Sequence, residues 1–270
     1  MTPELFLAQI QLDVLELMRL SQKNKWLDPY GEPKRAADDL GYPIHAHLAA
    51  RFGELAPQPF RPMRALSTAS RPGSGSNRHL TVLGYCRVDA HRLRKAEDEF
   101  ALPDAHQLGR SGVLATKPMP DSLFTSGRRL GFELRACPIM RFFRKTTVDW
   151  VKGPKTFPKG RELDVFLHRH KVQGEEVDRA TTYRDWLADR LGEAAQLEEC
   201  HLHAFRRVRV LRRTQAGANE RKPSVSERPD ALLRGNLRIT DVDLFRKAVS
   251  RGVGRHKAFG FGMLLLRPPS

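Results

Sequence analysis

The hydrophobic positions of the first half of the chain switch between the period of a strand and the period of a helix. Residues 5–15 carry an apolar side chain at every second position, all on one face, which predicts a half-buried strand. Residues 20–35 are polar and contain prolines and a glycine, so they predict a loop. Residues 43–52 repeat apolar side chains at the spacing of one buried helix face: Ile44, Leu48 and Phe52. Two strands, a short charged helix and a closing strand are predicted at residues 63–70, 80–88, 89–100 and 112–118.

The second half repeats this order of elements. A strand, a helix, two strands, a helix and a strand are predicted at residues 129–139, 181–191, 198–211, 231–239, 240–249 and 261–267. The order β-α-β-β-α-β is that of a ferredoxin-like, or RRM-like, unit. We therefore predict an α+β fold of two tandem ferredoxin-like domains with basic insertions, residues 1–122 and 123–270.

Residues 141–171 interrupt the regular pattern with a basic segment. It holds nine Lys or Arg and three Asp or Glu, and its glycines and prolines predict no regular element. Clustered cations of this kind are typical of a nucleic-acid contact. The candidate RNA-binding residues here are Arg144, Lys145, Lys155, Lys159 and Arg161.

A second basic segment, residues 206–213, contains five arginines in eight residues. On a strand the side chains alternate, so Val208 and Val210 share the face opposite three of the arginines. A charged strand edge that prevents aggregation is the alternative, but five arginines exceed that need. We predict RNA contact by Arg207, Arg209, Arg212 and Arg213.

A glycine-rich loop, residues 252–262, lies between the last predicted helix and the last predicted strand. Thr240 and Asp243 predict a capping box at the start of that helix. The order helix, loop, strand is the reverse of the common mononucleotide loops, and it suits an extended nucleic-acid backbone better. Successive backbone N–H groups in such a loop can bind an anion, although a plain turn remains the alternative. The candidate RNA-binding residues of the loop are Gly252, Gly254, Arg255, His256, Gly260 and Gly262.

The charge of the chain strengthens the nucleic-acid prediction. The formal net charge is +16 and the isoelectric point is near 10.3, which favours a polyanionic partner. No uncharged apolar run is long enough to span a membrane, and the first residues lack the pattern of a secretory signal. We expect a cytoplasmic protein without a membrane partner.

Neither a metal site nor a cofactor is predicted. The three cysteines are widely spaced, and His201 and His203 have no further ligands at useful spacing. The acidic residues form no converging cluster for two metal ions.

The loop, the helix before it and three more segments resemble the CRISPR repeat-processing endoribonucleases, in the CasE branch of the RAMP superfamily. The segments are residues 130–139, 186–192 and 232–239. The long basic insertions also allow a type IV counterpart. The resemblance implies metal-independent cleavage, in which the 2′-OH attacks the adjacent phosphate and leaves 2′,3′-cyclic phosphate and 5′-OH ends.

The same resemblance implies the catalytic residues. In the CasE branch a tyrosine is followed three residues later by the catalytic histidine, and Tyr42 and His45 fit this spacing. Lys257 matches a lysine in the glycine loop, with His256 as a reserve for proton transfer. Lys34 and Arg35 are candidates for RNA binding and for the catalytic role that Lys or Arg takes in other branches. A histidine at the edge of the core remains the alternative for His45.

The expected function is cleavage of CRISPR precursor transcripts within the repeat, next to a stem-loop. We expect the protein to stay on the mature guide RNA and to join other subunits of a ribonucleoprotein complex. A non-catalytic guide-RNA-binding RAMP subunit would share the fold, the charge and the loop. A general RNA-binding protein is weaker, because the aromatic strand signature of RRM sheets is absent.

Overall fold

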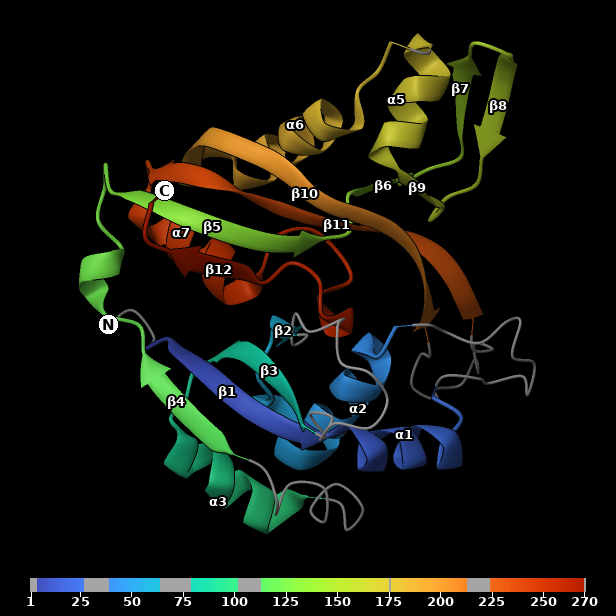
Figure 1. Cartoon of the computed structure of the whole chain (residues 1–270). Helices are drawn as coiled ribbons and strands as arrows, with labels where there is room; N and C mark the ends of the chain where they lie inside the picture. The colour runs from blue at the N-terminus through green and yellow to red at the C-terminus, as the bar shows by residue number, and fades with distance from the viewer. Residues whose placement is uncertain are drawn as a thin grey trace, which may run out of the picture. The chain divides into compact units, whose positions relative to one another are not determined.

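The computed structural model describes residues 4–26, 39–63, 79–101, 113–174, 176–212 and 224–269. Their contacts divide the chain into two compact units. The first unit comprises Met1–Leu123, Val208–Glu227 and His256–Met263, and the second comprises Phe124–Arg207, Arg228–Arg255 and Leu264–Ser270. Each unit contains one four-stranded antiparallel sheet (Figure 1).

The sheet of the first unit has the strand order β2-β3-β1-β4. Central strand β1 pairs with both β3 and β4, so that Ile10 lies opposite Val82 on one side and Leu114 on the other. The elements are β1 (Phe6–Asp13), α1 (Val14–Lys23), α2 (Gly41–Phe52), β2 (Phe60–Met63), β3 (His79–Cys86), α3 (Ala90–Phe100) and β4 (Leu114–Pro118). Of the strand predicted at 63–70, residues 64–70 lie outside the described residues.

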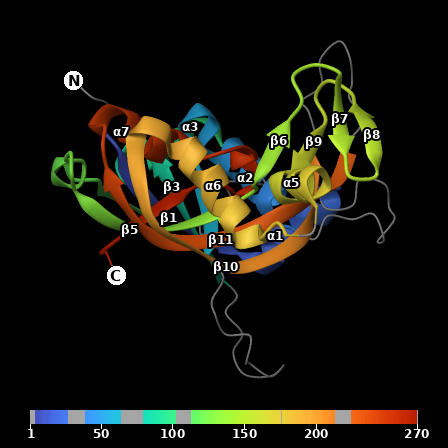
Figure 2. The ribbon, with the colours of Figure 1, turned by 90° about the horizontal axis from the view of Figure 1, so that it is seen from above.

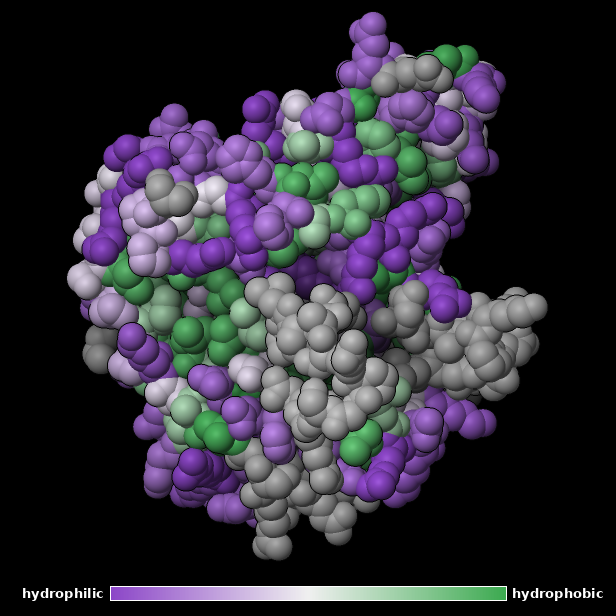
Figure 3. Space-filling model, viewed as in Figure 1, coloured by the Kyte–Doolittle hydropathy of each residue, from purple (hydrophilic) through white to green (hydrophobic). Residues whose placement is uncertain are grey.

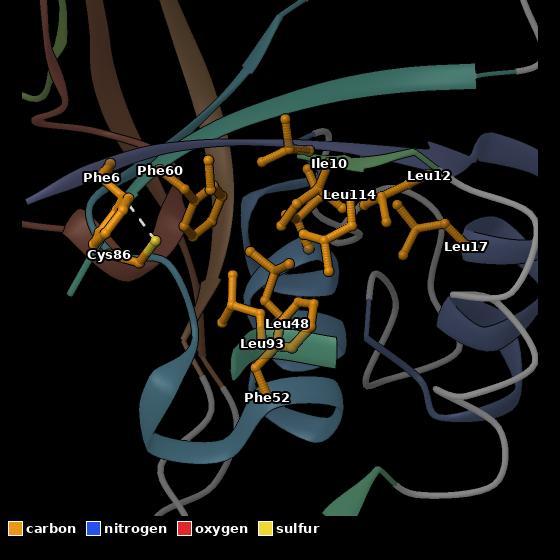
Figure 4. Close-up of a cluster of buried hydrophobic side chains, with 13 residues drawn as sticks. Phe6, Ile10, Leu12, Leu17, Leu48, Phe52, Phe60, Cys86, Leu93 and Leu114 are labelled. Atoms are coloured by element: carbon orange, nitrogen blue, oxygen red, sulfur yellow. Dashed lines mark hydrogen bonds between the residues drawn. The ribbon is translucent and has the colours of Figure 1, made fainter. Parts of the chain in front are cut away.

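Helix α2 packs its predicted apolar face against this sheet. Ile44, Leu48 and Phe52 are at most 2% exposed and share a core cluster with Ile10 and Leu12 (Figure 4). Burying side chains of this size contributes roughly 1.5–3 kcal/mol each. The hydrophobic effect therefore fixes which face of α2 points inward and which side chains remain outside.

Helix α1 lies where the sequence predicted the end of a strand and a loop. The Asp13 carboxylate accepts hydrogen bonds from the backbone N–H groups of Leu15 and Glu16, at 2.9 and 3.2 Å, and so caps the first turn. Capping ends β1 at Asp13 and starts a helix that continues to Lys23. The prediction was wrong for residues 14–23 because Asp13, which caps the helix, was taken as part of the alternating strand pattern.

The sheet of the second unit has the order β10-β11-β5-β12. With strands numbered within each unit, both sheets have the order 2-3-1-4 of a ferredoxin-like unit, so the predicted fold class is confirmed. The elements are β5 (Arg129–Ala136), α6 (Arg179–Leu191), β10 (Ala195–Arg212), β11 (Ser224–Ile239), α7 (Val242–Arg251) and β12 (Leu264–Arg267). The 3-10 turns of the two units are η2 (Gly53–Leu55), η3 (Asp121–Leu123), η4 (Gly192–Ala194) and η5 (Lys257–Phe259).

Helix α7 starts differently from the prediction. The Asp241 carboxylate caps it by accepting a hydrogen bond from the N–H of Leu244, at 2.8 Å. The predicted capping box of Thr240 and Asp243 was wrong, because the Thr240 hydroxyl instead donates to the carbonyl of Glu193.

The basic insertion of the second unit is folded, contrary to the prediction. It forms β6 (Ile139–Arg141), β7 (Thr146–Trp150), β8 (Gly153–Phe157), β9 (Glu162–Asp164) and α5 (Val165–Gln173) (Figure 2). Strand β6 pairs with β9, and β7 pairs with β8. Its glycines mark turns instead of interrupting elements, since Gly153 and Gly160 both have positive φ. Phe142 stacks on Phe157 at 4.7 Å and forms a small apolar core.

Arg179 at the start of α6 fixes this insertion to the sheet. Its guanidinium carbon lies 3.8 Å from the ring centre of Phe166 in α5 and 4.0 Å from that of Phe205 in β10. The same group donates hydrogen bonds to the Tyr183 hydroxyl and to the Asp164 carboxylate, at 2.6 and 3.2 Å. One cation thus joins α5, α6, β9 and β10.

Candidate functional site

The start of helix α2 and the last part of the glycine loop form one contact within the first unit. The Asp39 carboxylate accepts a hydrogen bond from the N–H of Gly41 at 2.8 Å and shapes the backbone before the helix. A side-chain carbon at Gly41 would clash with the carbonyl oxygen of Phe259. The two backbones can therefore approach this closely only because residue 41 is glycine.

The loop residues 256–260 have an unusual backbone. Gly260 and Gly262 have positive φ, as do Gly252 and Gly254 earlier in the loop. His256 also has a positive φ of 61°, in the left-handed region that few residues other than glycine adopt. The turn is closed by the N–H of Phe259, which donates to the carbonyl of His256 at 2.8 Å. Such local strain is common at functional sites.

Three rings gather where α2 meets this turn. The Tyr42 ring lies 6.3 Å from that of Phe259, with the planes inclined by 30°. The His256 ring lies 5.7 Å from the same phenylalanine. Phe259 therefore brings Tyr42 and His256, two predicted site residues, to one place.

His45 lies three residues after Tyr42, on the same face of α2. It is half-buried, and the loss of solvent lowers its pKa below the usual value of 6.5. Within the described part of the chain its ring makes no hydrogen bond. A mostly neutral imidazole at neutral pH can accept a proton.

His47 lies on the opposite side of the helix and is completely buried. Burial, together with the nearby positive charge of Arg51, lowers its pKa to about 3. Among the described residues neither ring nitrogen has a hydrogen-bond partner. Its role is therefore one of packing.

Along the arginine-rich strand, buried and more exposed side chains alternate only over residues 208–210. Val208 and Val210 are buried, whereas Arg209 is half-buried. Leu211 is buried as well, so the alternation ends there. The side chains of Lys34, Arg35, Arg212 and Arg213 lie outside the described residues.

The first part of the glycine loop belongs to the second unit. Gly254 packs on the ring of Trp186, which leaves no room for a side chain. The Arg255 side chain donates to the Glu162 carboxylate at 2.9 Å, and Glu162 also accepts from Arg228 at 3.0 Å. Glu162 therefore orients Arg255, one of the candidate RNA-binding residues of the loop.

The predicted cations of the insertion are all exposed. The surface over α5, β7 and β8, at the upper right of Figure 3, is mostly hydrophilic. In the described residues no ion pair neutralises the group Arg144, Lys145, Lys155, Lys159 and Arg161. Lys155 lies over the Trp150 ring at 4.7 Å. Arg207, at the start of the arginine-rich segment, is exposed too.

The contributions of four residues were not predicted from the sequence. They are Asp39, Gly41 and Phe259 in the first unit and Glu162 in the second. No sequence signal pointed to Gly41, because the predicted helix covered residues 43–52 whereas the observed helix starts at Gly41. Within the described ranges no group of three His, Cys, Asp or Glu side chains could hold a metal ion. Among the helices described, none is long and apolar enough to cross a membrane.

The protein is therefore of the α+β class, with two ferredoxin-like units and a glycine-rich loop before the last strand. A family model described as "CRISPR associated protein" matches residues 5–268, so the chain belongs to the family of CRISPR associated proteins. No curated protein sequence matches it.

Solved structures share the fold at low identity. A CRISPR endoribonuclease Cse3 bound to a 19 nt RNA has a TM-score of 0.58 and 17% identity, over 98% of this chain and all of that one. Thermus thermophilus Cse3, bound to an RNA representing a pre-cleavage complex, has a TM-score of 0.53 and 16% identity, over 98% and 100% of the two chains. A CRISPR-associated protein from the same organism has a TM-score of 0.51 and 16% identity, over 97% and 100%.

Gly41→Ala should weaken the contact between α2 and the loop. The added methyl group meets the Phe259 carbonyl, and such overpacking lowers the free energy of unfolding by about 1–3 kcal/mol. Urea unfolding measures this change. Ala50→Ser on the same helix is the control and should cost about 0.5 kcal/mol. Equal stabilities of the two variants would contradict the close approach.

His47 should make the protein sensitive to acid. In the unfolded state His47 binds a proton below pH 6.5, whereas in the native state it stays neutral down to about pH 3. The free energy of unfolding therefore falls as the pH falls, and this group contributes a loss of about 2 kcal/mol between pH 7 and pH 5. Urea unfolding at the two pH values should show a correspondingly smaller loss for His47→Leu. The same loss in both proteins would show that His47 is not responsible.

Proposed function

We propose that this protein is a metal-independent endoribonuclease that cuts CRISPR precursor transcripts within the repeat, beside a stem-loop. The contact of the α2 start with the turn at Lys257–Phe259 is the observation that carries the proposal, since it joins Tyr42 and the loop in one unit. The family match supports a role in CRISPR RNA processing and binding. Of the two Cse3 structures that share the fold, one is a CRISPR endoribonuclease bound to a 19 nt RNA, and the other is bound to an RNA representing a pre-cleavage complex.

The reaction needs only groups that a protein and RNA supply. The ribose 2′-oxygen attacks the neighbouring phosphorus, and the bond from phosphorus to the 5′-oxygen breaks. The products are a 2′,3′-cyclic phosphate and a 5′-OH end. The protein must take the proton of the 2′-OH, give one to the 5′-oxygen and stabilise the extra negative charge.

The described side chains suit these tasks. His45 is the proposed base, because its lowered pKa keeps the imidazole neutral near pH 7. Lys257 is proposed to stabilise the phosphate charge, and His45 to return the proton to the 5′-oxygen, with His256 as the reserve for proton transfer. Tyr42, with its ring against Phe259, is proposed to orient the ribose or the phosphate.

Binding of the stem-loop is assigned to the exposed cations. The insertion presents a group of exposed cations that form none of the ion pairs described: Arg144, Lys145, Lys155, Lys159 and Arg161. Arg207 is exposed as well, and exposed positive charge suits the phosphates of A-form RNA. Arg209, a half-buried residue of the first unit, is a further candidate for RNA binding. We propose that the protein remains on the cut RNA and joins the other subunits of a CRISPR ribonucleoprotein complex.

The test is incubation with repeat RNA in EDTA, with products separated on a gel. We expect cutting by the wild type in EDTA, and no cutting when the scissile ribose lacks its 2′-OH. His45→Ala should slow cutting by about 10²–10⁴-fold, the usual contribution of a general base, and should retain binding. His91→Ala, on the exposed surface of α3, is the control and should cut normally.

The outcomes separate the alternatives. Loss of cutting in EDTA, or normal cutting of the 2′-deoxy RNA, would disprove the mechanism. Normal cutting by His45→Ala would move the proton transfer to His256, Lys34 or Arg35. Tight binding of repeat RNA that stays intact would identify a non-catalytic guide-RNA-binding subunit.

The rate of cutting should depend on pH in a way that reports His45. Only the neutral ring can accept the 2′-OH proton, so the rate rises with pH and levels off once the ring is neutral. Because burial lowers the pKa of His45, the midpoint of this rise should lie below pH 6.5. Single-turnover rates from pH 4.5 to 8 measure it. A midpoint above pH 6.5 would contradict the assignment.

A further inference from the structure

Phe143 is the most exposed of the large apolar side chains described, at 81%. It lies in the bend between β6 and β7, where the insertion turns from one small sheet to the other. An aromatic ring left in water loses the free energy that burial would supply. The position therefore needs an explanation.

The backbone holds this ring outward. Phe142, the preceding residue, is buried and stacks on Phe157 with nearly parallel planes. The N–H of Phe142 donates to the carbonyl of Arg161 at 3.0 Å, and its own carbonyl accepts from Gly160 at 2.7 Å. With Phe142 fixed from both sides, its neighbour cannot turn into the same core.

Cations surround Phe143 along the chain. Arg141 precedes it by two residues, and Arg144 and Lys145 follow it directly; all three are exposed. Two acidic residues of the insertion are occupied elsewhere, because Glu162 binds Arg228 and Arg255 while Asp164 binds Arg179. Within the described part of the chain Arg141, Arg144 and Lys145 form no ion pair, so the charges next to the ring in sequence are not neutralised.

We propose that Phe143 is a stacking platform for an unpaired base of the bound RNA. Arg144 and Lys145 would hold the phosphates beside that base. An exposed aromatic ring among cations is the arrangement that binds single-stranded nucleic acid, since every base has a face that can stack. The inference rests on the proposed function and adds an unpaired base beside the stem-loop to the RNA that the insertion binds.

The test compares two RNAs: the blunt stem-loop, and the same stem-loop with a single-stranded extension carrying 2-aminopurine. Phe143→Ala should bind the extended RNA roughly ten-fold more weakly and the blunt RNA as the wild type does. Phe143→Trp should keep full affinity. The wild type should quench the 2-aminopurine fluorescence, and Phe143→Ala should not. Val151→Ala, which also removes an exposed apolar side chain from the insertion, is the matched control and should change nothing.

Each other outcome overturns the inference. Unchanged binding of both RNAs by Phe143→Ala would leave the ring to a protein partner. Equal weakening for both RNAs, or the same effect from Val151→Ala, would show a general change of the insertion. If the wild type cuts the stem-loop and Phe143→Ala binds and cuts both RNAs equally well, only the stacking role of Phe143 is disproved. A wild type that binds neither RNA disproves the proposed function as well.

Discussion

The close approach of the Phe259 carbonyl to Gly41 is the contact on which the candidate site depends. It joins a helix near the start of the chain to a turn near residue 260, and it leaves no space for any side chain at position 41. The hydrophobic face of α2 fixes the helix on its sheet, and the Asp39 hydrogen bond fixes its first turn. Tyr42 and His45 are thereby held by packing on one side and by backbone contact on the other.

Buried carboxylates organise the arginines of the second unit in a similar way. Asp230 accepts from Arg135 and Arg206, and although burial would raise the pKa of its carboxyl, these arginines lower it. Glu162 and Asp164 hold arginines of the loop and of α6. Breaking a buried pair of this kind is expensive, because the remaining charge keeps its cost of desolvation. The high net charge therefore has two parts, one that holds the second unit together and one that remains on its surface.

The sequence predicted the fold class because strand and helix periods are local properties. The face of α2 with Ile44 and Leu48 and the repeated order of elements followed directly from them. Helix α1 was missed because its capping residue, Asp13, stood at the end of an alternating strand. The insertion was missed because its glycines mark turns in a folded hairpin. The Gly41 contact could not be predicted, since it joins segments far apart in the sequence through backbone atoms that carry no pattern.

The membership of His256–Met263 in the first unit has a consequence for biosynthesis. Strands β1 to β4 and the helix with His45 are translated before the turn that packs on that helix. A nascent chain can thus assemble the early sheet before the turn at residues 257–259 completes the candidate site.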